Sequence, residues 1–520
     1  MLKIGRRDFL VSGTAASASA AIGVQGLGQI LFSKEARAAI GDTLTIAYNV
    51  APPSWDPNIG PSSTNPSLQT IYRTIYDTYM MQREDLTLAP GIIDQWSWNA
   101  DKSAISLRVR QNGTWHDGKP VTPEDIVWNL RRLTDASLGA PLQVSFAGLK
   151  NFKIDGQTIT MDMTQPWRAT MLERLAFLGC FLLAPHHHEK VGKEGFERAP
   201  MGSGPYKFDQ YERGSFLRLK AHPGYWGGKP LFETVIFKIV TDAASRVAEI
   251  ERGSSHVTMD LQYEEYDRLR QKSGLSGVAA PTTDIAMMFF HSTGPMADIN
   301  VRKAAMHAVD KKLIVDRLLR GYGKPVDTLS VPQEKVFDQG IVTQYDPKLA
   351  AELLAKSGYS REKPIEFTVQ TTRGFRPKDY EIVQAIVEMW RQVGIKGNIE
   401  VYEPAKHFEL RMSHKLAPAA FYVWGNSMGD PETSIASAIR SVSPHSSWKS
   451  PDVDAIADPL FGERDEQKRI AGYQRLNRYV AENGYLFPLF QIYQPVVFKS
   501  ELDFKPHLAG YVLPTAFGRK

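Results

Sequence analysis

The sequence predicts an α/β protein, because strand-like and helix-like segments alternate along most of the chain. The clearest unit is a strand at 365–371, a helix at 380–393 with apolar residues recurring on one face, and a strand at 399–402. Such a unit is the building block of a parallel sheet. A chain of 520 residues is also too long for one core, so we expect about two or three domains.

Further strands follow from short apolar runs. Residues 44–48 form the first predicted strand, and apolar and polar side chains alternate at 107–110 and 159–163, as they do in half-buried strands. Residues 200–208 lead into another predicted strand, and two more strands are predicted at 215–220 and 234–240.

Helix ends carry equally clear signals. In the stretch 111–130, Asp117-Gly118 supplies a turn, Thr122 can cap a helix, Pro123 suits its first position and Asp125 can complete a capping box. Two later helices are predicted from the same kind of signal, at 298–310 and 346–358.

The first 38 residues are predicted to be an export signal. Residues 5–10 read Gly-Arg-Arg-Asp-Phe-Leu, a twin-arginine pattern, and a small-residue apolar segment leads to the cleavage pattern Ala36-Arg37-Ala38. A membrane anchor is the alternative, but the segment holds too many polar and small residues for a span of about 20 apolar ones. We therefore expect a soluble periplasmic protein, exported by the twin-arginine route.

Charge excludes one class of partner. The leader carries five basic and two acidic side chains, so its removal lowers the formal net charge from +5 to +2. No basic run or basic–aromatic array stands out, and we expect no nucleic-acid partner.

Enzyme chemistry has little support. The motifs H-E-x-x-H, C-x-x-C and the P-loop are absent. The lone Cys180 stands in an apolar run and is predicted to be a core residue. His186-His187-His188 is the one metal candidate, but adjacent side chains on an extended chain point apart. We expect no enzyme, no metal and no cofactor.

Several blocks, taken in order, resemble the family 5 extracellular solute-binding proteins of bacterial ABC importers. The blocks are Trp55-Asp56-Pro57-Asn58, Leu88-Ala89 with Trp96, Trp115 to Asp125, Met201 to Tyr206, Tyr225-Trp226-Gly227-Gly228, Val301 to Ala304 and Ala308-Val309-Asp310. The resemblance implies a two-lobed periplasmic binding protein fold of class II, with an extra subdomain in lobe one and two hinge strands.

The resemblance also implies domain limits. After the signal at 1–38, lobe I is expected at 39–286, with its extra subdomain at about 76–200. Lobe II is expected at 287–489, and 490–520 returns to lobe I. The crossings are placed near 284–290 and 487–493.

Two loops of lobe II are candidate ligand-binding segments. In dipeptide-binding relatives the loop at 372–377 carries an Arg that pairs with the ligand carboxylate, followed two residues later by an aromatic residue; Arg373 and Phe375 occupy these positions. An Arg fork can hold a carboxylate or phosphate in a bidentate way. A surface Arg near a turn is the alternative.

The second loop is 422–431. In peptide-binding relatives it reads like W..D..DP, and the first Asp holds the peptide amino group; here that position is Ser427. Trp424, Gly425, Asn426 and Ser427 are the candidate site residues of this loop, although Trp424 could equally be a core residue. Asp430 is more simply a helix cap.

These loops predict an anion anchor without an ammonium anchor. We therefore expect an anionic non-peptide solute, such as an opine or sugar conjugate, delivered by a monomeric receptor to a membrane-embedded ABC permease. A di- or oligopeptide receptor is the alternative, if an acid from elsewhere such as Glu403 holds the amino group. A periplasmic hydrolase on a two-lobed scaffold is the alternative of another class.

Overall fold

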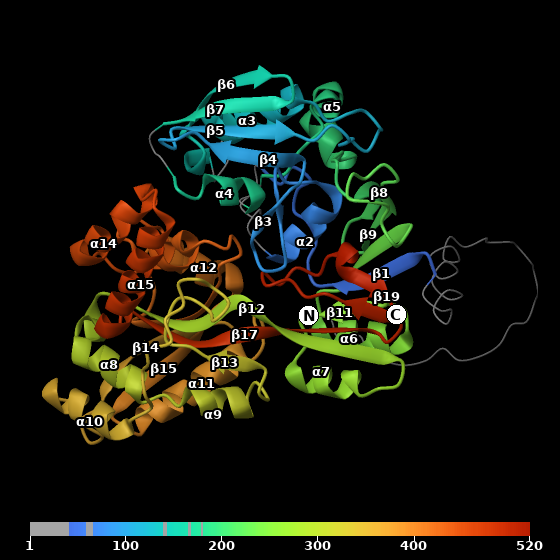
Figure 1. Cartoon of the computed structure of the whole chain (residues 1–520). Coiled ribbons are helices and arrows are strands. Elements are labelled where there is room, and N and C mark those ends of the chain that lie inside the picture. Colours follow the sequence, from blue (N-terminus) through green and yellow to red (C-terminus); the bar gives the residue numbers. More distant parts are fainter. Residues whose placement is uncertain (1–40, 59–65, 139–142, 165–167, 178–179) are drawn as a thin grey trace, which may run out of the picture. The chain divides into compact units, whose positions relative to one another are not determined.

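A mixed sheet of eleven strands organises the described part of the chain (Figure 1). Its order is β15-β14-β16-β12-β17-β11-β1-β10-β9-β8, and β13 pairs with β17 off this path. The structure is a computed structural model that describes residues 41–58, 66–138, 143–164, 168–177 and 180–520. The predicted export signal at 1–38 lies outside the described residues.

The strands of this sheet have the following bounds: β1 (Thr43–Tyr48), β8 (Tyr206–Glu212), β9 (Phe216–Ala221), β10 (Thr234–Ile239), β11 (Val257–Met259), β12 (Leu275–Phe290), β13 (Gly323–Pro325), β14 (Ile365–Thr371), β15 (Ile395–Val401), β16 (Ala419–Trp424) and β17 (Leu486–Lys499).

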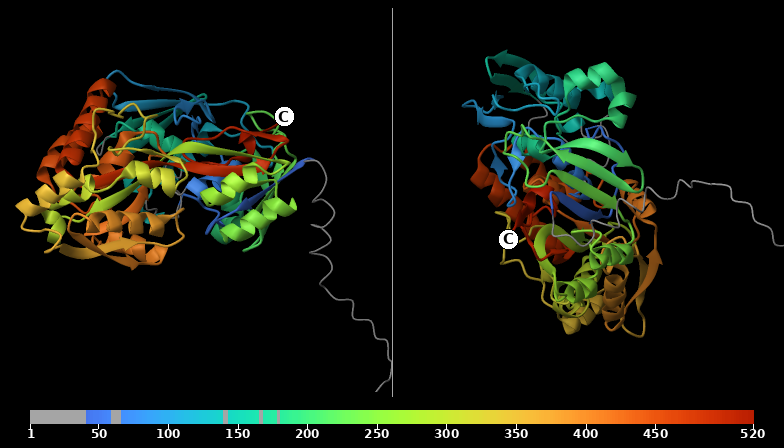
Figure 2. Two further views of the ribbon diagram at one scale, coloured as in Figure 1. Left: turned by 90° about the horizontal axis from the view of Figure 1, so that it is seen from below. Right: turned by 90° about the vertical axis from the view of Figure 1, so that its right-hand side faces the viewer.

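The long strands β12 and β17 lie side by side in the middle of the sheet (Figure 1 and Figure 2). They pair antiparallel, β17 continues the sheet to β11, and β12 continues it to β16. The segments expected to cross between lobes, 284–290 and 487–493, lie within these two strands.

Parallel pairing occurs in both halves of the sheet. β1 pairs in parallel with β10 and β11, and β14 pairs in parallel with β15 and β16. Helix α11 (Asp379–Arg391) packs against β14 and β15, so the predicted strand–helix–strand unit is confirmed, with its second strand beginning earlier, at Ile395.

A separate four-stranded sheet has the order β4-β5-β7-β6. Its strands are β4 (Ile93–Trp98), β5 (Ala104–Val109), β6 (Leu149–Asp155) and β7 (Thr158–Met163). Helix α3 (Pro123–Thr134) packs beside it and begins with the predicted capping box: Thr122 Oγ1 accepts from the Asp125 amide at 3.2 Å, and Asp125 Oδ2 accepts from the Thr122 amide at 3.0 Å.

The remaining helices cover the sheets. Asp298 and Asp346 cap α8 and α10, as predicted. The helices are α2 (Pro66–Ile75), α4 (Met171–Phe177), α5 (Pro185–Arg198), α6 (Ala243–Arg252), α7 (Tyr263–Arg270), α8 (Ile299–His307), α9 (Lys311–Arg317), α10 (Pro347–Lys356), α12 (Pro404–Met412), α13 (Ser437–Ile439), α14 (Pro451–Gly462) and α15 (Glu466–Asn483), with a π-helical turn at Glu432–Ala436. Short strands pair as β2 (Met81–Gln82) with β3 (Leu88–Ala89) and β18 (Leu502–Phe504) with β19 (Phe517–Arg519).

The apolar core follows these layers. Cys180 is fully buried among apolar side chains of the cluster around the four-stranded sheet, which confirms its predicted core role. Within the described ranges, no helix combines the length and apolarity that a membrane span requires.

Candidate functional site

A cavity of about 560 Å³ opens where parallel strands of the large sheet end. Its wall includes Asn49 after β1, Thr241 after β10, Asp260 after β11 and Gly374 after β14. Ligands of α/β proteins bind outside the carboxyl ends of parallel strands, because the loops that follow these strands converge there. This cavity is therefore the candidate site, and we call it the cleft.

A bulge in β12 brings a carboxylate into the cleft. Pro281 pairs with Tyr493 and Ile285 pairs with Gln491, so three residues of β12 stand opposite one residue of β17. The bulge is held by Thr282, whose hydroxyl donates to the Ile492 carbonyl at 2.9 Å and whose carbonyl accepts from Gln491 Nε2 at 2.7 Å. Bulges re-aim side chains beside functional sites. Here the bulge places Asp284 in the cleft wall.

Asp260 is a second acid in the cleft, and neutral amides hold it. Asn49 Nδ2 donates to Asp260 Oδ2 at 2.6 Å, and Gln494 Nε2 donates to Asp260 Oδ1 at 3.3 Å. The nearby Arg246 guanidinium is directed at backbone, since it donates to the carbonyls of Val240, Thr241, Met259 and Asp260. Arg246 therefore has little capacity left to bind an anion.

Two oxygens of the cleft residues lack a donor. Asn49 Oδ1 and Gln262 Oε1 are buried side-chain acceptors without a hydrogen-bond partner within the described structure. A buried acceptor without a donor costs free energy, on the order of 1–3 kcal/mol. A solute that brings N–H groups would relieve this cost.

The loop after β14 is shaped by Asp379, the first residue of α11. Its carboxylate accepts from Thr372 Oγ1 at 2.6 Å and from the amides of Gly374, Phe375 and Arg376 at 2.8, 3.1 and 3.2 Å. Gly374 has a φ of 79°, which a residue with a side chain rarely adopts. These constraints fix which side chains reach the cleft.

Of the two site residues predicted in this loop, Phe375 lines the cleft and Arg373 does not. Phe375 lines the cleft and is 56% exposed. The Arg373 guanidinium instead stacks over the Tyr380 ring, 3.7 Å from its centroid. Arg376, which sequence reasoning missed, lines the cleft with its Nη1 3.8 Å from Asp284 Oδ2.

The predicted residues of the second loop, Trp424, Gly425, Asn426 and Ser427, do not line the cleft. Gly425 lies against Asp284, since a Cβ atom there would overlap Asp284 Oδ1. Trp424 donates from Nε1 to the Ser434 carbonyl at 2.8 Å, and its ring lies beside the Arg411 guanidinium. Asn426 donates to Glu334, and the Ser427 carbonyl accepts from Gln82 Nε2 at 2.8 Å. Asn426 and the Ser427 backbone thus hold the loop in place.

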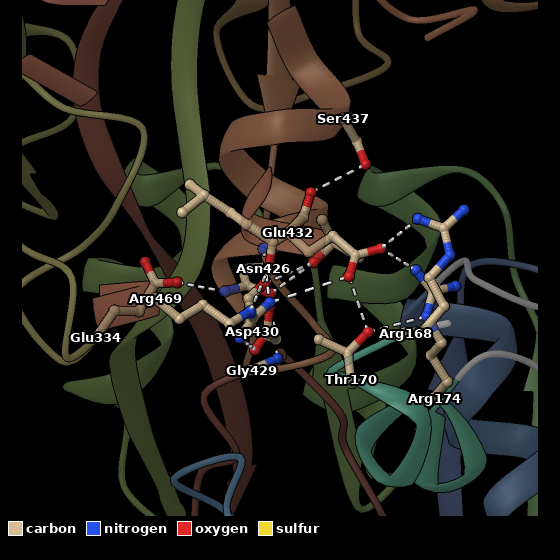
Figure 3. A network of polar contacts seen from close by, with 12 residues as sticks. Arg168, Thr170, Arg174, Glu334, Asn426, Gly429, Asp430, Glu432, Ser437 and Arg469 are labelled. Carbon is tan, nitrogen blue, oxygen red and sulfur yellow. Dashed lines mark hydrogen bonds and ion pairs between the residues drawn. The ribbon is translucent and has the colours of Figure 1, made fainter. Parts of the chain in front are cut away.

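Beyond this loop lies a buried ionic network, which we call the latch (Figure 3). Glu432, in the π-helical turn, accepts from Thr170 Oγ1 at 2.9 Å and is paired with Arg174 of α4. Arg168 Nη1 lies 3.7 Å from the same carboxylate. Glu432 is 1% exposed and Arg174 is 6% exposed, so this is a buried pair between segments that lie far apart in the chain.

The same network continues on the Asp430 side. Asp430 accepts from the amide of Glu432 at 2.8 Å, which agrees with its predicted capping role, and it is also paired with Arg469 of α15. Burial raises the pKa of Glu173, beside the latch, to about 7, and it raises the pKa of Glu334 to about 7 as well. Glu173 Oε2 is buried without a hydrogen-bond partner in the described structure.

The histidine triplet does not form a metal site. The three residues start helix α5 rather than an extended chain, so that premise was wrong; side chains one residue apart still point about 100° apart. His186 Nε2 lies 2.9 Å from Asp117 Oδ2, and His187 Nε2 lies 2.7 Å from the Ala199 carbonyl. Among the described residues, no group of three or more His, Cys, Asp or Glu side chains could hold a metal ion.

Comparison with known proteins decides the family. Residues 87–442 match the bacterial extracellular solute-binding proteins, family 5. The chain belongs to this family. Its members are receptors of ABC importers that bind peptide or small-molecule solutes and deliver them to permeases.

Individual members of family 5 match over most of the chain. A dipeptide-binding protein of Escherichia coli is 24% identical over 486 residues, which cover 87% of this chain and 90% of that protein. Heme-binding protein A of Haemophilus influenzae is 23% identical over 92% of this chain and 91% of its own length. The crystal structure of a dipeptide-binding protein from a Pseudoalteromonas species, in complex with Met-Leu, has a TM-score of 0.79 at 18% identity and covers 92% of this chain and 100% of its own. The predicted two-lobed α/β fold is confirmed.

Sequence reasoning missed Asn49, Asp260 and Asp284. Asn49 and Asp260 directly follow the last residues of β1 and β11, a signal that a search for strand ends could have used. Asp284 gives no such signal, because it lies inside a strand and reaches the cleft only through the bulge. Glu403, the other acid considered for the amino group, is exposed at the start of α12 and lies outside the cleft lining.

Proposed function

We propose that this family 5 receptor binds a short peptide through its free amino group. The observation that carries the proposal is the excess of acceptors in the cleft. Asp260 and Asp284 supply two carboxylates, and the oxygens of Asn49 and Gln262 add two acceptors without donors. An ammonium group with three N–H donors, followed by peptide N–H groups, complements such a wall.

An anionic non-peptide, the solute expected from the sequence, is unsupported. Of the two arginines that line the cleft, Arg246 is occupied by backbone carbonyls, which leaves Arg376 to hold an anion. Relatives that bind dipeptides add weight to the peptide alternative. In this proposal Arg376 binds the peptide carboxylate and Phe375 covers an apolar side chain.

The remaining expectations belong to the same proposal. The protein acts as a periplasmic monomer that reaches the periplasm by the twin-arginine route after cleavage near Ala38. Lobe I comprises 39–286 with 490–520, and lobe II comprises 287–489. The receptor captures and delivers its solute without chemical change.

A thermal-shift screen tests this function. The panel holds di- to hexapeptides, their N-acetylated forms, nickel, haem, and anionic opine or sugar conjugates. A ligand at 100 times its Kd stabilises the folded state by about 2.7 kcal/mol, which is a measurable shift. We expect shifts with free-amino peptides. Shifts confined to anionic non-peptides would reject the proposal, and turnover of a bound compound would favour the hydrolase.

A further inference from the structure

We propose that Asp284 is the specificity-determining residue of the cleft: its carboxylate holds the solute's ammonium group from hinge strand β12, in space that Gly425 leaves open. The proposal rests on the proposed function and deepens it. It assigns the amino-group contact to a hinge strand, whereas the family resemblance would place it at the position of Ser427.

The Asp284 carboxylate is under-paired for its location. Its one ion pair is with Arg376, at 3.8 Å, a distance beyond hydrogen-bond range, and no hydrogen bond to its oxygens occurs within the described structure. Two other acids nearby already have donors: Asp260 accepts from two side-chain amides, and Asp379 accepts from a hydroxyl and several backbone amides. Asp284 therefore retains lone pairs for a ligand.

The Asp284 side chain is partly buried, with 23% of its surface exposed, so a solute can reach its carboxylate. Burial raises the pKa of its carboxyl above the usual value, while Arg376 opposes this shift and Asp260 adds to it. An ammonium group would add both a counter-charge and hydrogen-bond donors to this carboxylate. The ion pair so formed would be short, whereas Arg376 would be free to turn to the solute's carboxylate.

The backbone holds Asp284 in position. Thr282 holds the bulge between Pro281 and Ile285 through two hydrogen bonds to residues of β17, one made by its hydroxyl and one accepted by its carbonyl. The Thr283 amide also donates to the Leu508 carbonyl, at 2.9 Å. The carboxylate is thus presented from a rigid element, which favours a defined contact geometry over a loop contact.

Gly425 leaves room for the Asp284 carboxylate. A Cβ atom at residue 425 would overlap Asp284 Oδ1, so a side chain larger than hydrogen would displace the carboxylate. Two residues further on, Ser427 carries a neutral hydroxyl. In this proposal Asp284 takes the role that the resemblance gives to an acid at the position of Ser427.

Calorimetric titration of variants tests the assignment with a dipeptide and its N-acetylated twin. Asp284→Asn keeps the shape of the side chain and removes its charge. The substitution should weaken binding of the free-amino dipeptide about 10- to 100-fold, the range for a lost charged hydrogen bond. The Kd of the N-acetylated twin should change by no more than about twofold. Gly425→Ala should show the same selective loss.

Controls separate this role from a structural one. Asp346→Asn makes the same chemical change at the capping residue of α10, outside the cleft, where Asn also caps well, and it should bind both dipeptides like the wild type. An Asp284→Asn protein that loses both dipeptides equally, or neither, would overturn the assignment while the proposed function stands. A wild-type protein that binds no free-amino peptide would overturn the proposed function itself.

Discussion

At the residue scale, Glu173 is a carboxyl group whose buried surroundings disfavour its charged form. Glu173 has a buried oxygen without a partner, and its pKa is raised to about 7 by burial, with the like charge of Asp430 adding to the shift and Arg469 opposing it. The folded protein therefore retains a proton on Glu173 that the unfolded chain releases at lower pH. This group contributes a destabilisation that is absent below the unfolded pKa and grows as the pH rises toward about 7.

Glu173→Gln should consequently stabilise the protein at pH 8 by about 1–3 kcal/mol and change little at pH 4.5. Melting temperatures at the two pH values measure this. The exposed Glu352→Gln in α10 serves as a control and should shift neither value. Equal stabilisation at both pH values would show that Glu173 is not the titrating group.

The two arginines of the loop after β14 can be separated by experiment. Arg376 lines the cleft, whereas Arg373 stacks on Tyr380. Arg376→Ala should weaken binding of a peptide with a free carboxylate about tenfold or more relative to binding of its C-terminal amide. Arg373→Ala should change the affinities for both peptide forms alike. Calorimetry with both peptide forms measures the difference. The reverse result would favour Arg373, the residue predicted from the sequence.

At the element scale, the latch joins α4 and its preceding residues to the π-helical turn at Glu432–Ala436 (Figure 3). These two segments belong to different lobes in the proposed division of the chain. A buried pair that loses one partner leaves an uncompensated charge, at a cost of about 3–5 kcal/mol. We therefore expect that removing one partner of the latch makes the arrangement with the lobes together less favourable.

Glu432→Gln should weaken solute binding several-fold without touching the cleft, because closure would be less favourable. The weakening should shrink in the double variant Glu432→Gln/Arg174→Met, which removes both charges. Solute titration of the single and double variants measures this coupling. Additive losses would indicate that the two side chains do not act as a pair.

Elements with local signals could be predicted from the sequence, and elements that depend on distant pairing could not. Thr122, Pro123 and Asp125 define the start of α3 within four residues. The position of Asp284, in contrast, depends on how residues 281–285 pair with a strand some 200 residues later, and the latch depends on Thr170 meeting Glu432. The sequence thus predicts the frame of the cleft but not the acids that line it.

At the scale of the whole molecule, β12 and β17 connect both halves of the sheet (Figure 1). The cleft lies where β12 is irregular. Solute that contacts residues of both halves, such as Asp260 and Phe375, binds the closed arrangement better than an open one. We therefore expect binding energy to drive hinge closure.

Small-angle X-ray scattering of the mature protein should show a radius of gyration that falls on solute addition, with the same midpoint as calorimetric binding. The Glu432→Gln variant should need more solute for the same change. An unchanged radius at saturating solute would contradict closure.

The most direct test of the central claim is native mass spectrometry of the mature protein purified without denaturation, followed by identification of whatever it releases. We predict one bound compound per chain, released intact as a short peptide with a free amino terminus. Release of an anionic compound that lacks an amino group would contradict the account.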